Sequence, residues 1–204
     1  PAEGSKIITC HIGNGASVAA VKDGKSVDTS MGMTPLAGLM MGTRSGDVDP
    51  GIFPYVMDKT GLDMQGVIDM LNKKSGVAGI TGISSDMREV KAAADEGNKR
   101  AQLSNTMNFY RIKKYIGAYA AAMGGVDIII FAGGVGENQQ DCREMALEGL
   151  EFLGVELDKE VNNKMRGEEA ILSTPESKVK VLLIPTDEEM MIATDTYEIV
   201  KGLK

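Results

Sequence analysis

The sequence predicts one α/β domain, built from an antiparallel meander of short strands followed by strand–helix units. Two observations lead to this fold class. Near the start, three runs rich in valine and isoleucine are joined by glycine turns. Later, two continuous apolar runs each lead through a short turn into a helical pattern, as in the strands of an α/β sheet. A chain of 204 residues can bury a sizeable core, and no linker, low-complexity tract or repeat of fixed period divides it.

The meander comes first. Strands are expected over residues 6–12, 16–24 and 25–32, and the second junction is Asp23-Gly24, a dipeptide that favours a tight hairpin. At the first junction the glycines on either side of Asn14 permit a sharp bend that exposes successive N–H groups, as a phosphate site requires. An ordinary hairpin is the more frequent outcome of Asn-Gly when this stretch is taken alone.

Helices dominate the middle of the chain. The spacing of apolar residues after Pro50 changes to the helical period, and each of the first two helices ends in glycine. Ser84, Ser85 and Asp86 are expected to cap the helix that follows them. The helices are expected over residues 51–61, 62–76, 87–97 and about 99–123.

Two strand–helix units complete the domain. Residues 125–138 form an apolar strand that ends in a glycine loop, and a helix follows over residues 139–154. Another strand is expected over residues 178–185. A closing helix is expected over residues 188–202, with Thr186 or Asp187 as its N-cap.

Composition and charge exclude some partners. A net charge of −7, with no stripe of lysine and arginine, argues against nucleic-acid binding. Cys10 and Cys142 are too few and too far apart for a disulfide scaffold or a zinc site, which favours a reducing compartment, and no apolar run approaches the roughly 20 residues of a membrane span. We therefore expect a cytoplasmic location and no membrane. The chain enters its first strand almost at once and lacks an initiator methionine, so we expect it to be part of a longer protein.

Four further stretches are candidates for chemistry, each with an ordinary structural alternative. Gly133 and Gly134 precede a helix whose N-terminal amides can face an anion, but they complete neither a dinucleotide fingerprint nor a P-loop. Arg44, in a glycine-rich loop, can clamp a phosphoryl group or be a solvated surface arginine. The acidic residues 187–189 can hold Mg²⁺ or simply suit the helix dipole, and residues 84–88 can be a cap with a salt bridge. His11 alone is more often a core histidine than a ligand.

Together these features favour phosphoryl transfer over hydride transfer. A glycine hairpin, an arginine loop and two strand–helix junctions, one glycine-rich and one acidic, are the parts that hold a nucleoside triphosphate and its metal. A glycine-rich dehydrogenase remains an alternative that NADH titration would settle.

Six motifs, in order and without large gaps from about Lys6 to the end, resemble the C-terminal half of the acetate kinase (acetokinase) family of the sugar kinase, hsp70 and actin superfamily. The arginine loop and the stretch around Ser84 are specific to that family, whereas the glycine hairpin is shared with many relatives. The motifs are CHIGNGASVAAV, DTSMGMTPLAGLMMGTRSGDVDP, NKKSGVAGITGISSDMRE, YRIKKYIGAY, FAGGVGEN and IPTDEEMMIA.

The resemblance implies a ribonuclease H-like (actin-like ATPase) fold, with helices on both faces of a mixed sheet. It also implies ATP-dependent, reversible phosphorylation of acetate to acetyl phosphate, a homodimer, and Mg²⁺ or Mn²⁺ bound by Glu188. Arg44 matches the arginine that stabilises the phosphoryl group in flight, and Asp187 stands where the family usually has asparagine. The implied ATP/ADP-binding residues are His11, Ile12, Gly13, Asn14, Gly15, Asp86, Met87, Arg88, Gly134, Val135, Gly136, Glu137 and Asn138.

The same resemblance assigns residues 1–204 to a C-terminal nucleotide-binding domain. The family's N-terminal half contributes an acidic catalytic residue, an acetate-binding arginine, a second histidine and another metal-side ligand, and no stretch here matches them. We therefore expect weak nucleotide binding and negligible turnover from this chain alone. A propionate or butyrate kinase and a nucleotide-gated module like the actin or chaperone relatives remain alternatives.

Overall fold

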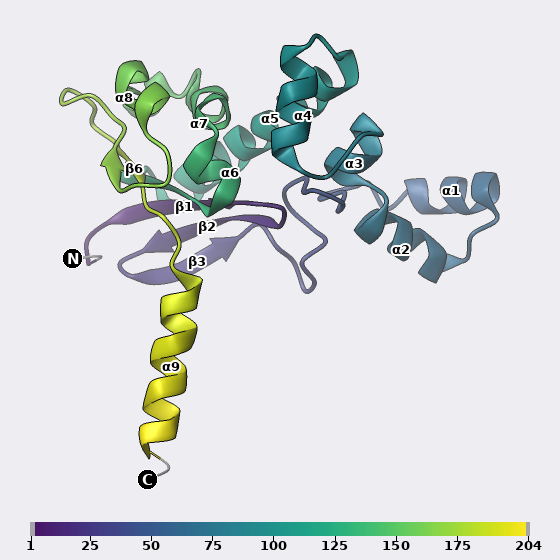
Figure 1. Cartoon of the computed structure of the whole chain (residues 1–204), viewed down its shortest axis with the longest axis horizontal. Helices are drawn as coiled ribbons and strands as arrows, with labels where there is room; N and C mark the ends of the chain where they lie inside the picture. The colour runs from purple at the N-terminus through teal and green to yellow at the C-terminus, as the bar shows by residue number, and fades with distance from the viewer. Residues whose placement is uncertain (1–2, 203–204) are drawn as a thin grey trace.

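The computed structural model describes residues 3–202, which form a six-stranded mixed sheet with helices packed against it (Figure 1). The strand order is β3-β2-β1-β4-β6-β5. This agrees with the expected meander followed by strand–helix units.

The meander occupies one side of the sheet. Its strands are β1 (Lys6–Ile12), β2 (Ala16–Lys22) and β3 (Lys25–Thr29), each antiparallel to the next. Asp23 and Gly24 both have positive φ, 53° and 74°, as a two-residue hairpin of the primed type requires. The hairpin predicted at this dipeptide is confirmed.

The parallel part of the sheet places three strand ends at one edge. Strand β4 (Ile128–Ala132) pairs in parallel with β1, and β6 (Lys180–Leu183) pairs in parallel with β4. A two-residue edge strand, β5 (Ala170–Ile171), was not expected. Because parallel strands end on the same side, the segments that follow β1, β4 and β6 lie together.

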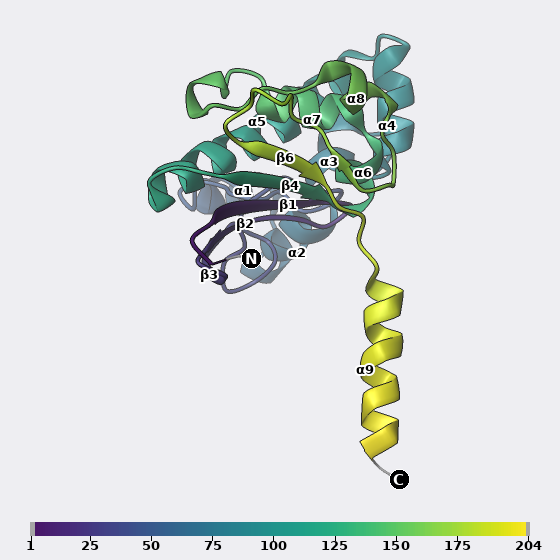
Figure 2. The ribbon, with the colours of Figure 1, turned by 90° about the vertical axis from the view of Figure 1, so that its left-hand side faces the viewer.

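The core lies on one face of the sheet. Alternate residues of β1 and β4 are fully or almost fully buried there, while their neighbours on the other face are half-buried. The long helix α5 (Lys99–Met123) and helix α7 (Gln140–Leu147) cover the buried face (Figure 2). Helix α9 (Glu188–Gly202) leaves on the opposite side and points away from the body.

Most helices lie where the periodicity places them. Helices α1 (Ile52–Thr60), α2 (Met64–Lys73) and α4 (Met87–Asp95) agree with the expected ranges to within three residues at each end, and α5 matches its range in full. The expected helix over residues 139–154 divides into α7 and the short 3₁₀ helix η1 (Glu151–Leu153), because Gly149 takes a positive φ of 79° between them.

Three six-residue helices were not predicted, because six residues are too few for a 3.6-residue period to show. Two of them are α3 (Gly76–Thr81) and α8 (Lys159–Lys164). The third, α6 (Gly133–Asn138), occupies the expected glycine loop. Gly133 has φ of 77° and lies against the backbone of Ile12, so the chain turns from β4 into a helix without a loop.

Helix α9 differs from the other long elements. None of its 15 residues is buried, although it carries several exposed apolar side chains. Across residues 3–202, no helix combines the length and the apolar character that a membrane span needs.

Candidate functional site

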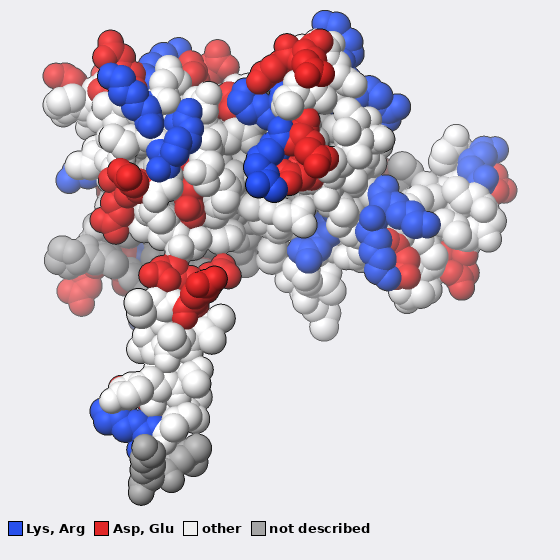
Figure 3. All heavy atoms as spheres, viewed as in Figure 1, with Lys and Arg blue, Asp and Glu red and all other residues white. Residues whose placement is uncertain are grey.

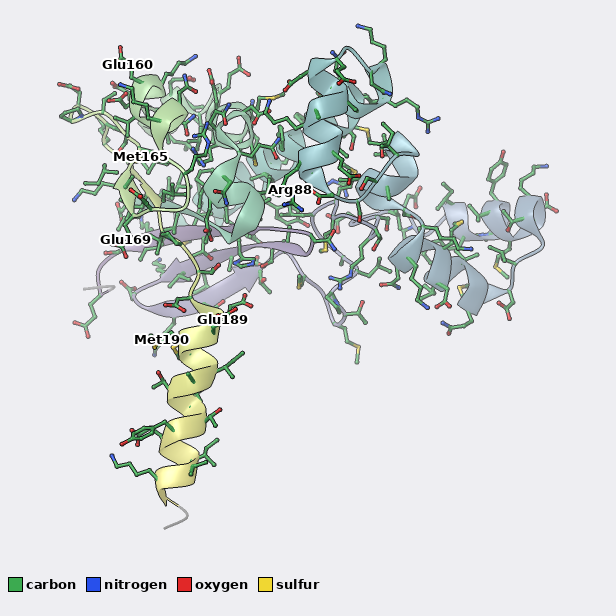
Figure 4. All side chains as sticks on the ribbon, in the orientation of Figure 1. Arg88, Glu160, Met165, Glu169, Glu189 and Met190 are labelled. Carbon is green, nitrogen blue, oxygen red and sulfur yellow. The ribbon has the colours of Figure 1, made fainter. Side chains whose placement is uncertain are left out.

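A cavity of about 820 Å³ opens between α4 and α6, beside the ends of β1 and β4. Its volume lies in the range typical of small-molecule sites. Arg88 lies between these two helices (Figure 4). The lining residues are Gly13, Asn14, Ser85, Asp86, Met87, Arg88, Lys91, Gly134, Val135, Asn138 and Gln139.

The turn between β1 and β2 contributes one part of the cavity wall. The N–H of Gly13 donates to the carbonyl of Gly15 at 3.0 Å, which closes the turn. The backbone carbonyl of the exposed Asn14 accepts from the N–H of Gly42 at 2.9 Å. A Cβ at Gly42 would overlap Oδ1 of Asn14. Glycine is therefore required at position 42 for the Asn14 side chain to lie as it does.

The start of α4 forms the opposite wall. Asp86 caps this helix by accepting from the N–H of Arg88 at 2.9 Å, and its Oδ2 also pairs with Nη2 of Arg88 at 2.6 Å. These bonds from Arg88 lower the pKa of Asp86 from its usual 3.8 to about 2. Lys91, one turn further along, makes an ion pair with Asp95 at 3.0 Å and lies 3.8 Å from Asp141. Two cations, Arg88 and Lys91, thus border the cavity, and each is paired with a carboxylate of this chain.

Arg44 lies beside the glycine turn. Its Nη1 is 3.7 Å from the position that a Cβ on Gly15 would take, and it contacts the carbonyl of Pro35 and Sδ of Met41, both at 3.4 Å. No ion-pair partner of Arg44 lies within residues 3–202. The half-buried guanidinium is therefore uncompensated by a carboxylate.

The loop that carries Arg44 is anchored on α5. Asp47 accepts from the N–H of Gly38 at 2.8 Å and from the hydroxyl of Tyr115 at 2.6 Å. Arg111 donates to the carbonyls of the same two loop residues, at 3.3 and 3.1 Å. Burial and the bond to Asp47 raise the pKa of Tyr115 to about 12, so its hydroxyl stays a donor at neutral pH.

The comparisons with known proteins agree with this geometry. A model of the acetokinase family matches residues 1–194. The chain belongs to the acetokinase family. It is 65% identical over 198 residues to the acetate kinase of Bacteroides thetaiotaomicron, a match that covers 97% of this chain and 50% of that relative.

Two solved structures show the same fold. The acetate kinase of Porphyromonas gingivalis superposes with a TM-score of 0.93 at 58% identity, covering 97% of this chain and 50% of that one. A propionate kinase from Francisella tularensis superposes with a TM-score of 0.85 at 41% identity, covering 93% and 48%. The chain therefore spans about half the length of the acetokinase relatives it matches.

Eight of the residues that the acetokinase motifs placed at the nucleotide line the cavity. Ile12 and Gly136 are buried behind the wall instead, because alternate residues of β1 and the inner side of α6 face the core. Gly15 belongs to the turn but faces Arg44. The eight are Gly13, Asn14, Asp86, Met87, Arg88, Gly134, Val135 and Asn138.

Two expected ligand residues have other positions. His11 is half-buried and lies neither in the core nor among the cavity residues, since it faces the side of β1 away from Ile12. Glu137 is 9% exposed, and its Oε1 accepts from the N–H of Gly133 at 2.8 Å. The same bond uses the N–H of Gly133, which was expected to be among the amides that can face an anion.

Two cavity residues, Lys91 and Gln139, were not predicted, and Ser85 was expected only in the cap before the helix at residues 87–97. Lys91 lies four residues after Met87, on the same side of α4, so helical spacing carried a signal for it. Gln139 immediately follows the motif that ends at Asn138, and it is almost fully buried.

The acidic segment after β6 provides the cap of α9 and an exposed carboxylate beside it. Asp187 accepts from the N–H of Met190 at 3.0 Å and so caps α9, as one of the two expected caps. Glu188 is exposed, and acidic side chains gather where α9 leaves the body (Figure 3).

Proposed function

We propose that this chain is the nucleotide-binding half of an acetate kinase, which reversibly transfers the γ-phosphoryl group of ATP to acetate and yields ADP and acetyl phosphate. The observation that carries the proposal is the cavity between α4 and α6, with the Asn14 turn and the unpaired Arg44 at one end. The names of the most similar relatives support the same activity.

In the proposed reaction an acetate oxygen forms a bond to the γ-phosphorus while the bond to the ADP oxygen breaks. The transition state is loose, with charge spread over the equatorial oxygens, so positioning and charge neutralisation supply most of the catalysis. Arg44 provides a fixed cation with a bidentate fork beside the glycine turn. The walls formed by α4 and α6 hold the nucleoside.

Mg²⁺ or Mn²⁺ is part of this proposal, with Glu188 as its protein ligand. Mg²⁺ uses one or two carboxylates and completes its octahedron with phosphate oxygens and water. Within residues 3–202 no three acidic, histidine or cysteine side chains are grouped to hold an ion, so a single exposed carboxylate fits a metal carried mainly by the nucleotide. The ion would neutralise charge on the β- and γ-phosphates.

We propose further that residues 1–204 are the C-terminal domain of the enzyme, and that the other half of the relatives' length completes the active site. The half-length match supports this division. The residues of β1 on the second face of the sheet are only half-buried, and α9 has no buried residue. Both observations also support a domain that packs against the missing half. The remaining acetate-binding and acid–base groups would come from that half.

A propionate kinase is the second candidate, because the propionate kinase structure superposes closely on this chain. The half that would hold most of the acyl pocket lies outside the matched region. Relative kcat/KM for acetate, propionate and butyrate on the full-length protein separates the two candidates. A preference for acetate of tenfold or more, about 1.4 kcal/mol, supports the first.

We also propose that the enzyme is a homodimer in the cytoplasm. Leu103, Met107 and Tyr110 are exposed at helical spacing on one side of α5, which supports contact with a second copy. Cys10 and Cys142 are free and buried, which supports a reducing compartment. Light scattering of the full-length protein tests the assembly, and a monomer at micromolar concentration would contradict it.

The activity itself is tested on the full-length protein with acetate, ATP and Mg²⁺, by trapping acetyl phosphate with hydroxylamine. The proposal expects ATP-dependent formation of acetyl phosphate and its reversal by ADP. ATP hydrolysis without an acyl product would instead favour a nucleotide-gated module.

A further inference from the structure

Glu137 joins two segments that are far apart in the sequence. Its Oε1 accepts from the N–H of Gly133 at 2.8 Å, and from the N–H and the hydroxyl of Thr186 at 3.0 and 3.1 Å. Gly133 begins α6, whereas Thr186 lies between β6 and α9. One buried carboxylate oxygen therefore holds the start of the cavity helix and the segment that leads to Glu188.

The backbone of Glu137 is itself held firmly. Arg143 is fully buried, and its Nη1 donates to the carbonyls of Gly136 and Glu137 at 2.8 and 2.9 Å. Its other nitrogens donate to Asn162 and to the carbonyl of Met165, at the end of α8. The cation thus sits at the carbonyl ends of two short helices, where the helix dipoles favour positive charge.

Thr186 has little else to hold it. The residue is exposed and follows Pro185, and within residues 3–202 its hydrogen bonds are the two that it donates to Glu137. The following residue, Asp187, hydrogen-bonds within the described part of the chain only to its own segment, where it caps α9 through the N–H of Met190. Helix α9 in turn has no buried residue that would fix it to the body. The position of residues 186–188 relative to α6 therefore depends on Glu137.

We infer that Glu137 is a positioning residue: it ties residues 186–188 to α6, and so sets Glu188 relative to the nucleotide cavity. The inference rests on the proposed function for the role of Glu188. It differs from that function in assigning Glu137 to the protein's own framework rather than to the nucleotide. Loss of the tie is expected to weaken metal binding in the nucleotide complex while leaving nucleotide binding without metal intact.

The test compares four variants of the 204-residue chain: Glu137→Ala, Glu137→Gln, Thr186→Val and Thr186→Ser. Three quantities are measured: ADP affinity in EDTA, Mn²⁺ affinity of the ADP complex by electron paramagnetic resonance, and hydrogen exchange of the Thr186 amide. Glu137→Ala is expected to weaken Mn²⁺ binding about tenfold and to speed exchange at least about tenfold, since the Thr186 amide loses the carboxylate that accepts its hydrogen bond. ADP affinity in EDTA is expected to stay within about twofold in Thr186→Val, because this variant keeps the bond from Gly133 to Glu137 and so leaves α6 in place in the cavity wall.

The other variants serve as graded controls. Glu137→Gln keeps an acceptor, and Thr186→Ser keeps both donors. Both variants are expected to keep Mn²⁺ affinity and Thr186 amide exchange within about threefold of wild type. Thr186→Val removes only the hydroxyl donor. Its Mn²⁺ affinity and amide exchange rate are expected to fall between those of the two conservative variants and those of Glu137→Ala. If Glu137→Ala does not fold, Thr186→Val against Thr186→Ser gives the same comparison.

Two results would overturn the inference. One is unchanged Mn²⁺ affinity and amide exchange in the variants that lose the tie. The other is an equal loss of ADP affinity in EDTA, which would make Glu137 a support of α6 alone. A wild-type chain that binds no ADP would instead refute the proposed function.

Discussion

Helices α6 and α9 both follow a parallel strand at the same edge of the sheet, yet they are supported very differently. Helix α6 has only six residues, but Gly133, Gly136 and Glu137 are buried, and Arg143 and Glu137 fix both of its ends. Helix α9 has 15 residues and none is buried. The difference indicates that α6, in the cavity wall, is held firmly by contacts within this chain, whereas α9, which begins at Glu188, buries no residue against the described body.

Substitution of Arg44 is expected to have the largest effect and to separate binding from transfer. In the full-length enzyme, Arg44→Ala should lower kcat at least about 100-fold, because it removes the cation that we propose to act on the phosphoryl group in flight. ADP affinity should change little, since Arg44 is not among the cavity residues. Steady-state kinetics and calorimetry measure the two quantities, and a parallel loss of both would make Arg44 a nucleotide ligand.

Removal of Arg143 tests the support of α6. Arg143→Met should lower the free energy of unfolding by about 3 kcal/mol or more, because it leaves several buried carbonyls without donors. Arg166→Met is the matched control: Arg166 is half-buried and also donates to Asn162 and Met165, so its loss should cost about 1 kcal/mol. Urea unfolding measures both, and equal costs would show that Arg143 is not the main support.

Truncation tests the other side of the comparison. Removal of residues 188–204 should change the free energy of unfolding by less than about 1 kcal/mol, since α9 buries no residue. Its amides should exchange with solvent much faster than those of β1 and β4. A loss of stability comparable to that of Arg143→Met would show that α9 packs on the body in solution.

The smallest expected effect concerns the rim of the cavity. The folded-state pKa of Asp86 is lowered to about 2, so its contribution to stability is present above pH 4 and is lost as the pH falls from about 4 toward 2. Arg88→Ala should raise this pKa toward 3.8 and, because the ion pair acts at every pH above about 4, should also remove its contribution to stability at neutral pH. Carboxyl NMR titration measures the pKa, and an unaltered value in the variant would remove Arg88 as the cause.

The sequence predicted best those elements that are long or end in strong signals. The range expected for helix α5, about residues 99–123, coincides with its bounds. Asn98 caps the helix by accepting from the N–H groups of Arg100 and Ala101, and Gly124 ends it with φ of 72°. Helices α3, α6 and α8 have six residues each and show no period, so only tertiary contacts define them.

The site was predicted in a similar way. Motifs identified Asn14, Asp86 and Asn138, which the structure brings to one cavity from three separate elements. The motif around Glu137 did not reveal that this carboxylate points inward to Thr186, because the contact spans 49 positions of the chain. Lys91 lay outside every motif, and only the helical turn from Met87 connects it to the cavity.

We propose that this chain alone binds the nucleotide but does not complete the transfer. The most direct measurement is made on the isolated 204-residue chain, with ADP affinity by calorimetry and acetyl phosphate formation in the presence of ATP, acetate and Mg²⁺. We expect saturable, weak ADP binding and no detectable acetyl phosphate. Robust turnover by this chain alone, or no ADP binding at millimolar concentration, would contradict it.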